Sequence, residues 1–285
     1  NGFAWSIYDE LRAEPGNRFF SPFSIYAALS MTYAGARGNT ATQLHDVLQI
    51  GGDDAQHHSE FGALIRDLSG EKAGRGYQLH VANRLFPRVG LDIEPAYLDL
   101  VATHYDAEPE SLDFAGAVEG ARARINEWVA EQTRDRIEEL IPEGVLSSVT
   151  ALVLANAVYF KARWAEQFDP AATHDAPFTR ADGTQVMAPM MSAEVDARLA
   201  RDGSSDTAPT LLELDYEDHE ISLVVVLPPT HDGLPAVEQT LVSGGYDPWL
   251  DGAYETEIQV QLPKLEFRDA FSVVDPLEAL GATDM

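Results

Sequence analysis

The longest apolar run of the chain covers residues 152–160, where Asn156 is the only polar residue. A run of this kind predicts a strand that is buried on both faces in the middle of a sheet. Because side chains alternate along a strand, Asn156 shares one face with Leu154 and Val158. A buried amide without partners would cost about 1–3 kcal/mol, so we expect the Asn156 side chain to be hydrogen-bonded.

Helical spacing dominates the first half of the chain. Residues 23–34 are apolar nearly all round, which predicts a helix inside a large domain, with Ser21 as its N-cap and Pro22 in its first turn. Residues 118–133 have one apolar face opposite a charged one, which is typical of a helix that covers a sheet. Further helices are predicted at residues 3–11, 59–68 and 95–105 and after Asp275.

Strand patterns dominate the second half. Alternating or continuous apolar segments predict strands at residues 77–85, 178–191, 211–216, 221–227 and around Pro263. No linker separates the helical half from the strand-rich half. A single α+β domain over residues 1–285 therefore explains the pattern best.

Charge and composition limit the partners. The formal charge is −28, from 47 acidic and 19 basic residues, which disfavours nucleic acid, heparin-like polyanions and anionic lipid. No run approaches 18 apolar residues, so we expect no span of a membrane. Without cysteine there is no disulfide or thiolate site, and the cellular compartment stays open. The chain begins at Asn1 without a signal peptide, which suggests processing or trimming.

Motifs for catalysis or metal binding are missing from the sequence: there is no G-x-S-x-G, H-E-x-x-H or P-loop. His57 and His58 with Glu60 could touch a metal, but a solvated loop is the better interpretation, since no third ligand stands at a fixed spacing. Glu138 and Glu139 read as an exposed acidic turn. We therefore expect neither an enzyme, nor a metal site, nor a cofactor.

Ordered motifs along nearly the whole chain resemble the serpin family. The first group, similar to helices B and C of serpins, is Asn17 to Ile25, Ala28-Leu29, Met31, Gly35-Ala36, Gly38, Thr40 and Gln43. The second, similar to helix F and its return segment, is Ile125-Asn126, Trp128-Val129, Thr133, Ile137 and Leu140-Ile141-Pro142. The third, similar to the third strand of sheet A, is Thr150, Leu152 to Leu154, Asn156-Ala157, Tyr159 to Lys161 and Trp164. Later landmarks are Phe168, Thr173, Phe178, Met190-Met191, Leu262-Pro263-Lys264 and Leu280-Gly281.

The resemblance implies a fold of three β-sheets and about nine helices, with a large central mixed sheet A covered by helix F. Ala162 departs from the glycine usual after Phe-Lys in the family. The absence of a signal peptide and of glycosylation sequons resembles prokaryotic-type or intracellular members, and we expect a prokaryotic-type member. We also expect a single serpin domain over residues 1–285 that lacks the C-terminal bait loop and the last strands.

The resemblance further implies a serine protease inhibitor that acts as a suicide substrate. A target serine protease cuts the exposed bait loop, an acyl-enzyme forms, and the loop inserts into sheet A as a new strand. Under this interpretation the scissile bond lies beyond Met285, and a C-terminal segment of the same protein is a partner of an otherwise monomeric chain. The alternative is a non-inhibitory serpin-fold carrier, chaperone or storage protein.

Two groups of site residues follow from the resemblance. Ser21, Ser24 and Asn156 correspond to the "shutter" beneath sheet A, although core polar groups and a helix cap would need the same residue types. Trp164 and Lys264 correspond to the "breach" at the top of the sheet, where the loop first enters. An ordinary solvated lysine is the other interpretation of Lys264.

Overall fold

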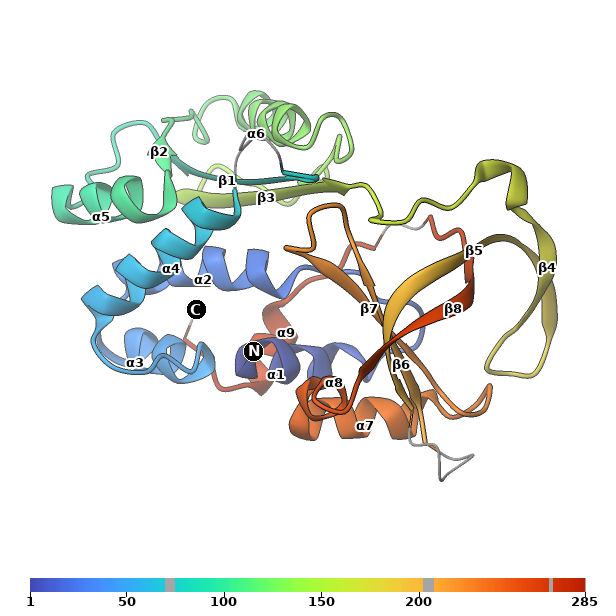
Figure 1. Cartoon of the computed structure of the whole chain (residues 1–285). Helices are drawn as coiled ribbons and strands as arrows, with labels where there is room; N and C mark the ends of the chain where they lie inside the picture. Colours follow the sequence, from blue (N-terminus) through green and yellow to red (C-terminus); the bar gives the residue numbers. More distant parts are fainter. Residues whose placement is uncertain (70–74, 202–207, 267–268, 285) are drawn as a thin grey trace.

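The computed structural model describes residues 1–69, 75–201, 208–266 and 269–284, which form nine α-helices, one 3-10 helix and eight strands (Figure 1). The helices are α1 (Gly2–Leu11), α2 (Pro22–Gly35), α3 (Gly38–Val47), α4 (Asp54–Leu68), α5 (Pro95–Tyr105), α6 (Val118–Gln132), η1 (Pro170–Ala172), α7 (Leu234–Gly244), α8 (Asp247–Leu250) and α9 (Val274–Ala279). The strands are β1 (Tyr77–Pro87), β2 (Glu108–Pro109), β3 (Leu152–Ala162), β4 (His174–Thr179), β5 (Gln185–Arg201), β6 (Thr210–Asp215), β7 (Ser222–Leu227) and β8 (Tyr254–Pro263).

The first sheet has the order β2–β1–β3 and is mixed. β1 and β3 are antiparallel over their whole length, from Tyr77 opposite Ala162 to Pro87 opposite Leu152, and β2 is parallel to β1. Among the described residues β3 is therefore an edge strand and β1 lies in the middle. That residues 152–160 form a central strand of a larger sheet stays a prediction, because an apolar run reports what covers the two faces of a strand, not what pairs with its edges.

Helices cover both faces of this sheet, which explains the apolar run. On one face Ala155 and Ala157 of β3 join a core cluster with Ile125 and Trp128 of α6. On the other face Leu154 packs against the cluster that contains Met31 of α2. Figure 1 shows α6 and α2 on opposite sides of β1 and β3. The predictions of a covering helix at 118–133 and of an interior helix at 23–34 are confirmed.

The second sheet joins β4, β5, β6 and β7 in that order, with β8 also paired to β5. Its longest strand, β5, pairs with β4 from Gln185 to Met190 and with β6 from Arg198 to Arg201. β8 lies antiparallel to β5 from Met190 to Leu199, so its pairing overlaps the ends of both regions. Because β5 runs through without a break, the described strands form two sheets, a mixed sheet of three strands and a second sheet of five.

A third region, made of helices, closes the molecule below the first sheet. Phe3 and Ile7 of α1, Leu44 of α3 and Leu277 of α9 share one buried cluster, and Figure 1 shows α9 beside α1. No helix within the described ranges is long and apolar enough to cross a membrane.

Candidate functional site

A chain of side-chain hydrogen bonds links α2 to both long strands of the first sheet. Ser24 Oγ donates to Asn156 Oδ1. Asn156 Nδ2 donates to Asn83 Oδ1 at 2.6 Å, and Asn83 Nδ2 donates to the carbonyl oxygen of Tyr105 at 2.9 Å. We call this group, Ser24, Asn156, Asn83 and the Tyr105 carbonyl, the polar lock. It confirms that the Asn156 amide is hydrogen-bonded.

The register of the strands positions the two asparagines. Asn83 lies directly opposite Asn156 in the β1–β3 pairing, so their side chains emerge on the same face of the sheet. That face is turned toward α2, whose first turn carries Ser24. The amides can each donate and accept, so every member of the polar lock finds a partner within it.

Ser21 has a different place from the one expected for a shutter residue. Its side chain accepts a hydrogen bond from the backbone N–H of Ser24 at 3.1 Å, and Ser21 is the N-cap of α2. Within the described hydrogen bonds, Ser24 contacts Asn156 and Ser21 does not. Ser21 therefore holds the helix end that presents Ser24, and the cap interpretation describes its observed contact.

Sequence reasoning missed Asn83. The alternation of residues 77–85 predicted its strand, but not that this strand would pair in the register that puts Asn83 opposite Asn156. The available signal was that each strand carries one asparagine at an otherwise apolar face. Asn83 is 4% exposed, so an unpaired amide there would destabilise the fold. Asn156 donates a hydrogen bond to its Oδ1 atom.

The second edge of β3 carries no strand among the described residues. Side chains at both of its ends are open to solvent: Leu152 is 36% exposed and Phe160 is 42% exposed. An unpaired strand edge of this length presents backbone donors and acceptors in the spacing that another strand would match. Among the described strands, the polar lock therefore lies next to the outer edge of the first sheet.

Trp164 follows directly after β3 and packs between the two sheets. Its ring stacks on Tyr216, with centroids 4.6 Å apart, and meets the edge of Phe168 at 6.0 Å. Trp164 also forms an isolated bridge with Tyr216, which ties the end of β3 to the second sheet. An indole in this position is fixed by packing at the end of the edge strand.

Lys264 follows β8 and is exposed. Its backbone N–H donates to the carbonyl of Pro189 at 2.9 Å. In the described part of the chain the Lys264 side chain forms no ion pair and no hydrogen bond with the Trp164 region. The structure thus places the two predicted breach residues on separate elements and leaves the ammonium group of Lys264 available.

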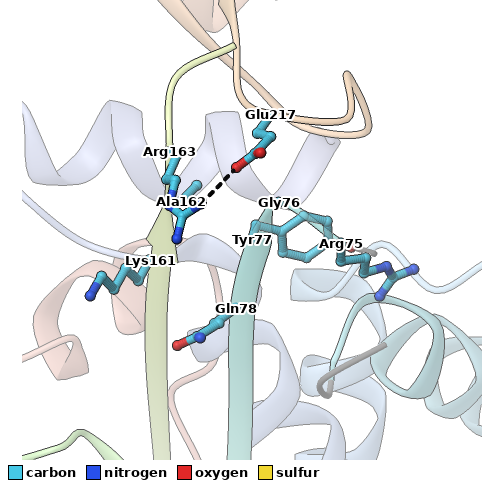
Figure 2. A pocket seen from close by; sticks show the side chains of 8 residues that line it. All are labelled: Arg75, Gly76, Tyr77, Gln78, Lys161, Ala162, Arg163 and Glu217. Carbon is cyan, nitrogen blue, oxygen red and sulfur yellow. Dashed lines mark ion pairs between the residues drawn. The ribbon is translucent and has the colours of Figure 1, made fainter. Parts of the chain in front are cut away.

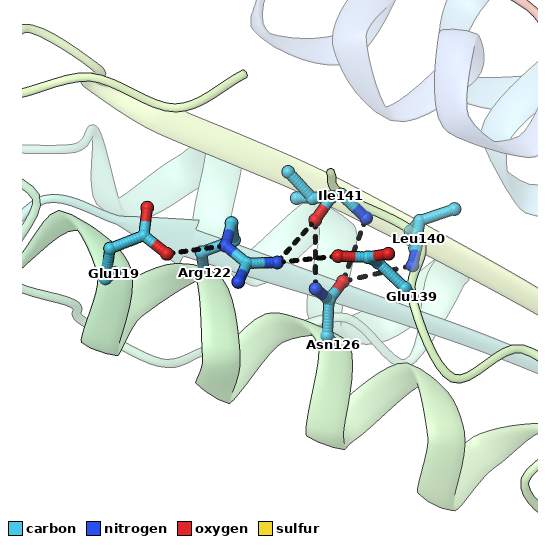
Figure 3. A network of polar contacts seen from close by, with 6 residues as sticks. All are labelled: Glu119, Arg122, Asn126, Glu139, Leu140 and Ile141. Atoms are coloured by element: carbon cyan, nitrogen blue, oxygen red, sulfur yellow. Dashed lines mark hydrogen bonds and ion pairs between the residues drawn. The ribbon is translucent and has the colours of Figure 1, made fainter. Parts of the chain in front are cut away.

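A second polar network holds the segment between α6 and β3 onto the covering helix (Figure 3). Asn126 Oδ1 accepts from the backbone N–H groups of Leu140 and Ile141, at 3.1 and 2.9 Å, and its Nδ2 donates to the Ile141 carbonyl at 2.9 Å. Arg122 adds an ion pair to Glu139 at 3.0 Å and a hydrogen bond to the same carbonyl. One buried amide thus fixes both the helix that covers the sheet and its return segment.

A cavity of about 330 Å³ lies where β1 begins and β3 ends (Figure 2). Its basic groups do not converge: the side chains of Arg75 and Lys161 extend away from each other, and Arg163 is paired with Glu217 at 3.6 Å. Arg75 is itself engaged, with its Nε 3.0 Å from a carboxylate oxygen of Glu220. We therefore see no built anion site there. No group of three potential metal ligands exists within the described residues.

The family comparison agrees with this geometry. The model of the family described as "Serpin (serine protease inhibitor)" matches residues 1–285. Among solved structures, emu (Dromaius novaehollandiae) ovalbumin has a TM-score of 0.91 at 27% identity and covers 99% of this chain and 76% of that one. A structure titled "Cleaved Serpin 42Da" has a TM-score of 0.91 at 32% identity, covering 100% of this chain and 75% of that one.

Curated relatives give the same result. Leukocyte elastase inhibitor of Bos taurus is 38% identical over 276 residues, which are 95% of this chain and 72% of the relative. Ipis-1 of Ixodes persulcatus is 34% identical over 287 residues, 99% of this chain and 74% of the relative. These similarities point to eukaryotic-type relatives, so our expectation of a prokaryotic-type member is wrong. The chain belongs to the serpin family of serine protease inhibitors.

Proposed function

We propose that this serpin inhibits a serine protease as a suicide substrate, and that the strand which inserts after cleavage pairs with β3. The observation that carries the proposal is the polar lock, which joins α2 to both long strands of the first sheet through small polar side chains. Side-chain hydrogen bonds between small polar groups can break and re-form as elements slide, whereas interlocked aliphatic side chains would leave voids. The name of the bovine relative, an inhibitor of leukocyte elastase, supports the same class of target.

The energetics of insertion depend on side chains more than on backbone pairing. A strand on the order of 14 residues gains roughly 20 hydrogen bonds at about 1 kcal/mol net each. Ordering the same residues costs about 1–2 kcal/mol each, which is a similar total. Burial of the alternate side chains, at about 1.5–3 kcal/mol for a large one, then determines the sign. The face of β3 toward α2 is where these side chains would be buried.

The remaining site residues take roles around this event. Ser24 and Asn156 form the shutter that opens, with Ser21 as the cap that holds Ser24 in place. Trp164 fixes the end of β3 where the loop enters first. Lys264 pairs with an acidic residue of the loop hinge, a role that its exposed and unpaired ammonium group permits.

A C-terminal segment of the same protein supplies the strands that complete both sheets, and residues 1–285 form one domain together with it. Exposed apolar side chains support this part of the proposal. Leu227, at the end of β7, is 63% exposed, and Leu265, just after β8, is 70% exposed. Side chains of this kind at the ends of strands are covered when a further strand packs beside them.

The test is incubation of the full-length protein with a panel of chymotrypsin-fold and subtilisin-like serine proteases. A suicide inhibitor forms a covalent complex that survives boiling in detergent, and active-site titration shows loss of protease activity in proportion. If every protease of the panel cleaves the bait loop and leaves without such a complex, the inhibitory function is wrong. The non-inhibitory carrier, chaperone or storage role then remains.

A further inference from the structure

Four of the eight histidines of the chain gather between four helices below the first sheet. They are His45 on α3, His57 and His58 on α4, and His104 on α5, and we call them the histidine cluster. The sequence predicted a solvated loop for His57 and His58, and this prediction is wrong. Asp53 caps α4, so the helix includes both residues, and His58 is only 3% exposed.

Aromatic and hydroxyl groups surround the two helix α4 histidines. His58 Nδ1 lies 2.6 Å from the Tyr105 hydroxyl, and His57 Nε2 lies 3.3 Å from the Ser30 hydroxyl. The ring of Tyr33 is 5.9 Å from that of His58 and 6.4 Å from that of His57. Within the described residues, His58 thus has one side-chain hydrogen-bond partner, the Tyr105 hydroxyl, and no carboxylate in contact.

The helices leave little room for rearrangement at this point. A Cβ atom on Gly62 of α4 would lie 2.5 Å from the backbone oxygen of His104, so α4 and α5 are in backbone contact there. The Nδ1 atom of His104 is buried and has no hydrogen-bond partner within the described residues. Water therefore has little access to a charge that forms on His58, which is 3% exposed.

Tyr105 connects the histidine cluster to the polar lock. Its hydroxyl contacts His58, and its carbonyl accepts the hydrogen bond from Asn83. Ser30, which contacts His57, belongs to the same helix as Ser24. A displacement of α4 and α5 relative to α2 therefore acts on both ends of the group that joins α2, β1 and β3.

The charges that face the cluster do not compensate a positive charge on His58. The titratable groups around His57 and His58 are Asp54 and Glu60 on α4, His45 on α3, His104 and Tyr105 on α5, and Tyr26 and Tyr33 on α2. Asp54 is exposed and already accepts a hydrogen bond from the Tyr33 hydroxyl at 2.6 Å. Protonation of one histidine also raises the cost of protonating its neighbours.

We propose that the histidine cluster makes the polar lock sensitive to pH, so that acidification separates α4 and α5 from α2 and eases the opening of the first sheet. The coupling to strand insertion rests on the proposed function, whereas the titration and its effect on the sheet do not. In this proposal Tyr105 is the connecting residue, because it contacts both groups.

The direction of the effect follows from burial. Burial lowers the pKa of His58 to about 4, with further lowering by His57 and His104, and burial also lowers the pKa of His57. The neutral imidazole is thus the folded form, and its stabilising effect is complete above pH 6.5, the ordinary pKa of histidine. Stability is lost as the pH falls from 6.5 toward 4, where the unfolded chain binds the proton first. Between pH 7.5 and 5, His58 alone lowers the ratio of folded to unfolded chain about 30-fold.

Two measurements on the chain test this proposal. The first is an NMR titration of ¹³C-labelled histidine side chains, in which the His58 signal is identified by its absence from His58→Gln. The second is hydrogen exchange of the amides in β1 and β3 at pH 7.5 and 5, corrected for the intrinsic exchange rate. His58→Gln keeps a neutral hydrogen-bonding group near Tyr105, and His174→Gln, which changes an exposed histidine, is the matched control.

We expect His58 to stay neutral below pH 5 and the opening of β1 and β3 to rise about tenfold or more from pH 7.5 to 5. His58→Gln abolishes most of this rise, and His174→Gln retains it. A His58 signal that titrates near pH 6.5, or a rise that persists in full in His58→Gln, overturns the proposal. If His58→Gln does not fold, Tyr105→Phe takes its place, because it removes the contact with His58 and should also reduce the rise. Neither measurement involves a protease, so failure of the inhibitory function leaves the result standing.

Discussion

Asn83 and Asn156 lie opposite each other in the β1–β3 register and are joined by a side-chain hydrogen bond of 2.6 Å. Through Ser24 on one side and the Tyr105 carbonyl on the other, this pair connects α2, α5 and the two long strands. Both amides are satisfied inside the protein, so the pair stabilises the closed sheet. Each of these bonds joins small polar groups. The strands and α2 can therefore separate, and the sheet can open, without creating a cavity.

Asn156→Ala should destabilise the closed sheet. It removes the acceptor of Ser24 and the donor to Asn83, and it leaves the buried Asn83 oxygen without a partner. We expect the free energy of unfolding to fall by about 2–3 kcal/mol, which lowers Tm by roughly 3–5 °C. Size-exclusion chromatography after mild heating should show more polymer than the unchanged protein. Equal Tm and equal polymer content in Asn156→Ala would remove the shutter role.

Ser21→Ala is the matched control for this variant. It removes the N-cap of α2 but leaves the contact between Ser24 and Asn156 in place. We expect a loss of about 1 kcal/mol, typical of a helix cap, with no additional polymer. A polymer yield equal to that of Asn156→Ala would show that Ser21 belongs to the shutter itself.

Asn126→Ala should release the segment between α6 and β3. The backbone groups of Leu140 and Ile141 lose the amide that holds them, and a local stabilisation of about 2 kcal/mol is lost. Limited proteolysis within residues 134–150 should then be roughly 30-fold faster, because cleavage follows the population of the opened segment. Arg122→Ala removes only partly exposed contacts and should change the rate at most about threefold. Equal rates for the two variants would mean that Asn126 is not the main attachment.

Lys264→Ala tests the breach in the full-length protein. Because Lys264 is exposed and forms no ion pair within the described ranges, we expect an unchanged Tm. Loss of its pairing with the hinge should slow loop insertion roughly fivefold, the effect of an ion pair worth about 1 kcal/mol. The number of inhibitor molecules consumed per protease should rise accordingly. As a control, Lys161→Ala, at another exposed lysine, should leave the number of inhibitor molecules per protease unchanged. The same unchanged number for Lys264→Ala would mean that Lys264 is only a solvated side chain.

The sequence identified Asn156 of the polar lock because a single amide in an apolar run needs partners wherever the run lies. It also predicted that both faces of β3 are buried, and the helices α2 and α6 cover them. Which edges are paired depends on contacts far apart in sequence, and the pattern along one strand carries no information on them.

The prediction that His57 and His58 lie in a solvated loop is wrong for a local reason. The apolar stripe that predicted a helix at 59–68 begins only at Phe61, whereas Asp53 starts the helix six residues after Val47, the last residue of α3. The first turns of α4 are polar in sequence and mostly exposed, but aromatic rings and hydroxyls of α2 and α5 pack against His57 and His58. Polar side chains that are buried by other polar side chains give no apolar signal, and His58 was therefore assigned to solvent.

The central claim is that a cleaved loop becomes a strand of the first sheet beside β3. Hydrogen exchange of the β3 amides, measured on the full-length protein before and after cleavage of the bait loop, tests it most directly. Our account predicts that cleavage slows exchange along β3 by two orders of magnitude or more, about 2–3 kcal/mol of added protection per opening. Exchange in β3 that is unchanged by cleavage would contradict the account.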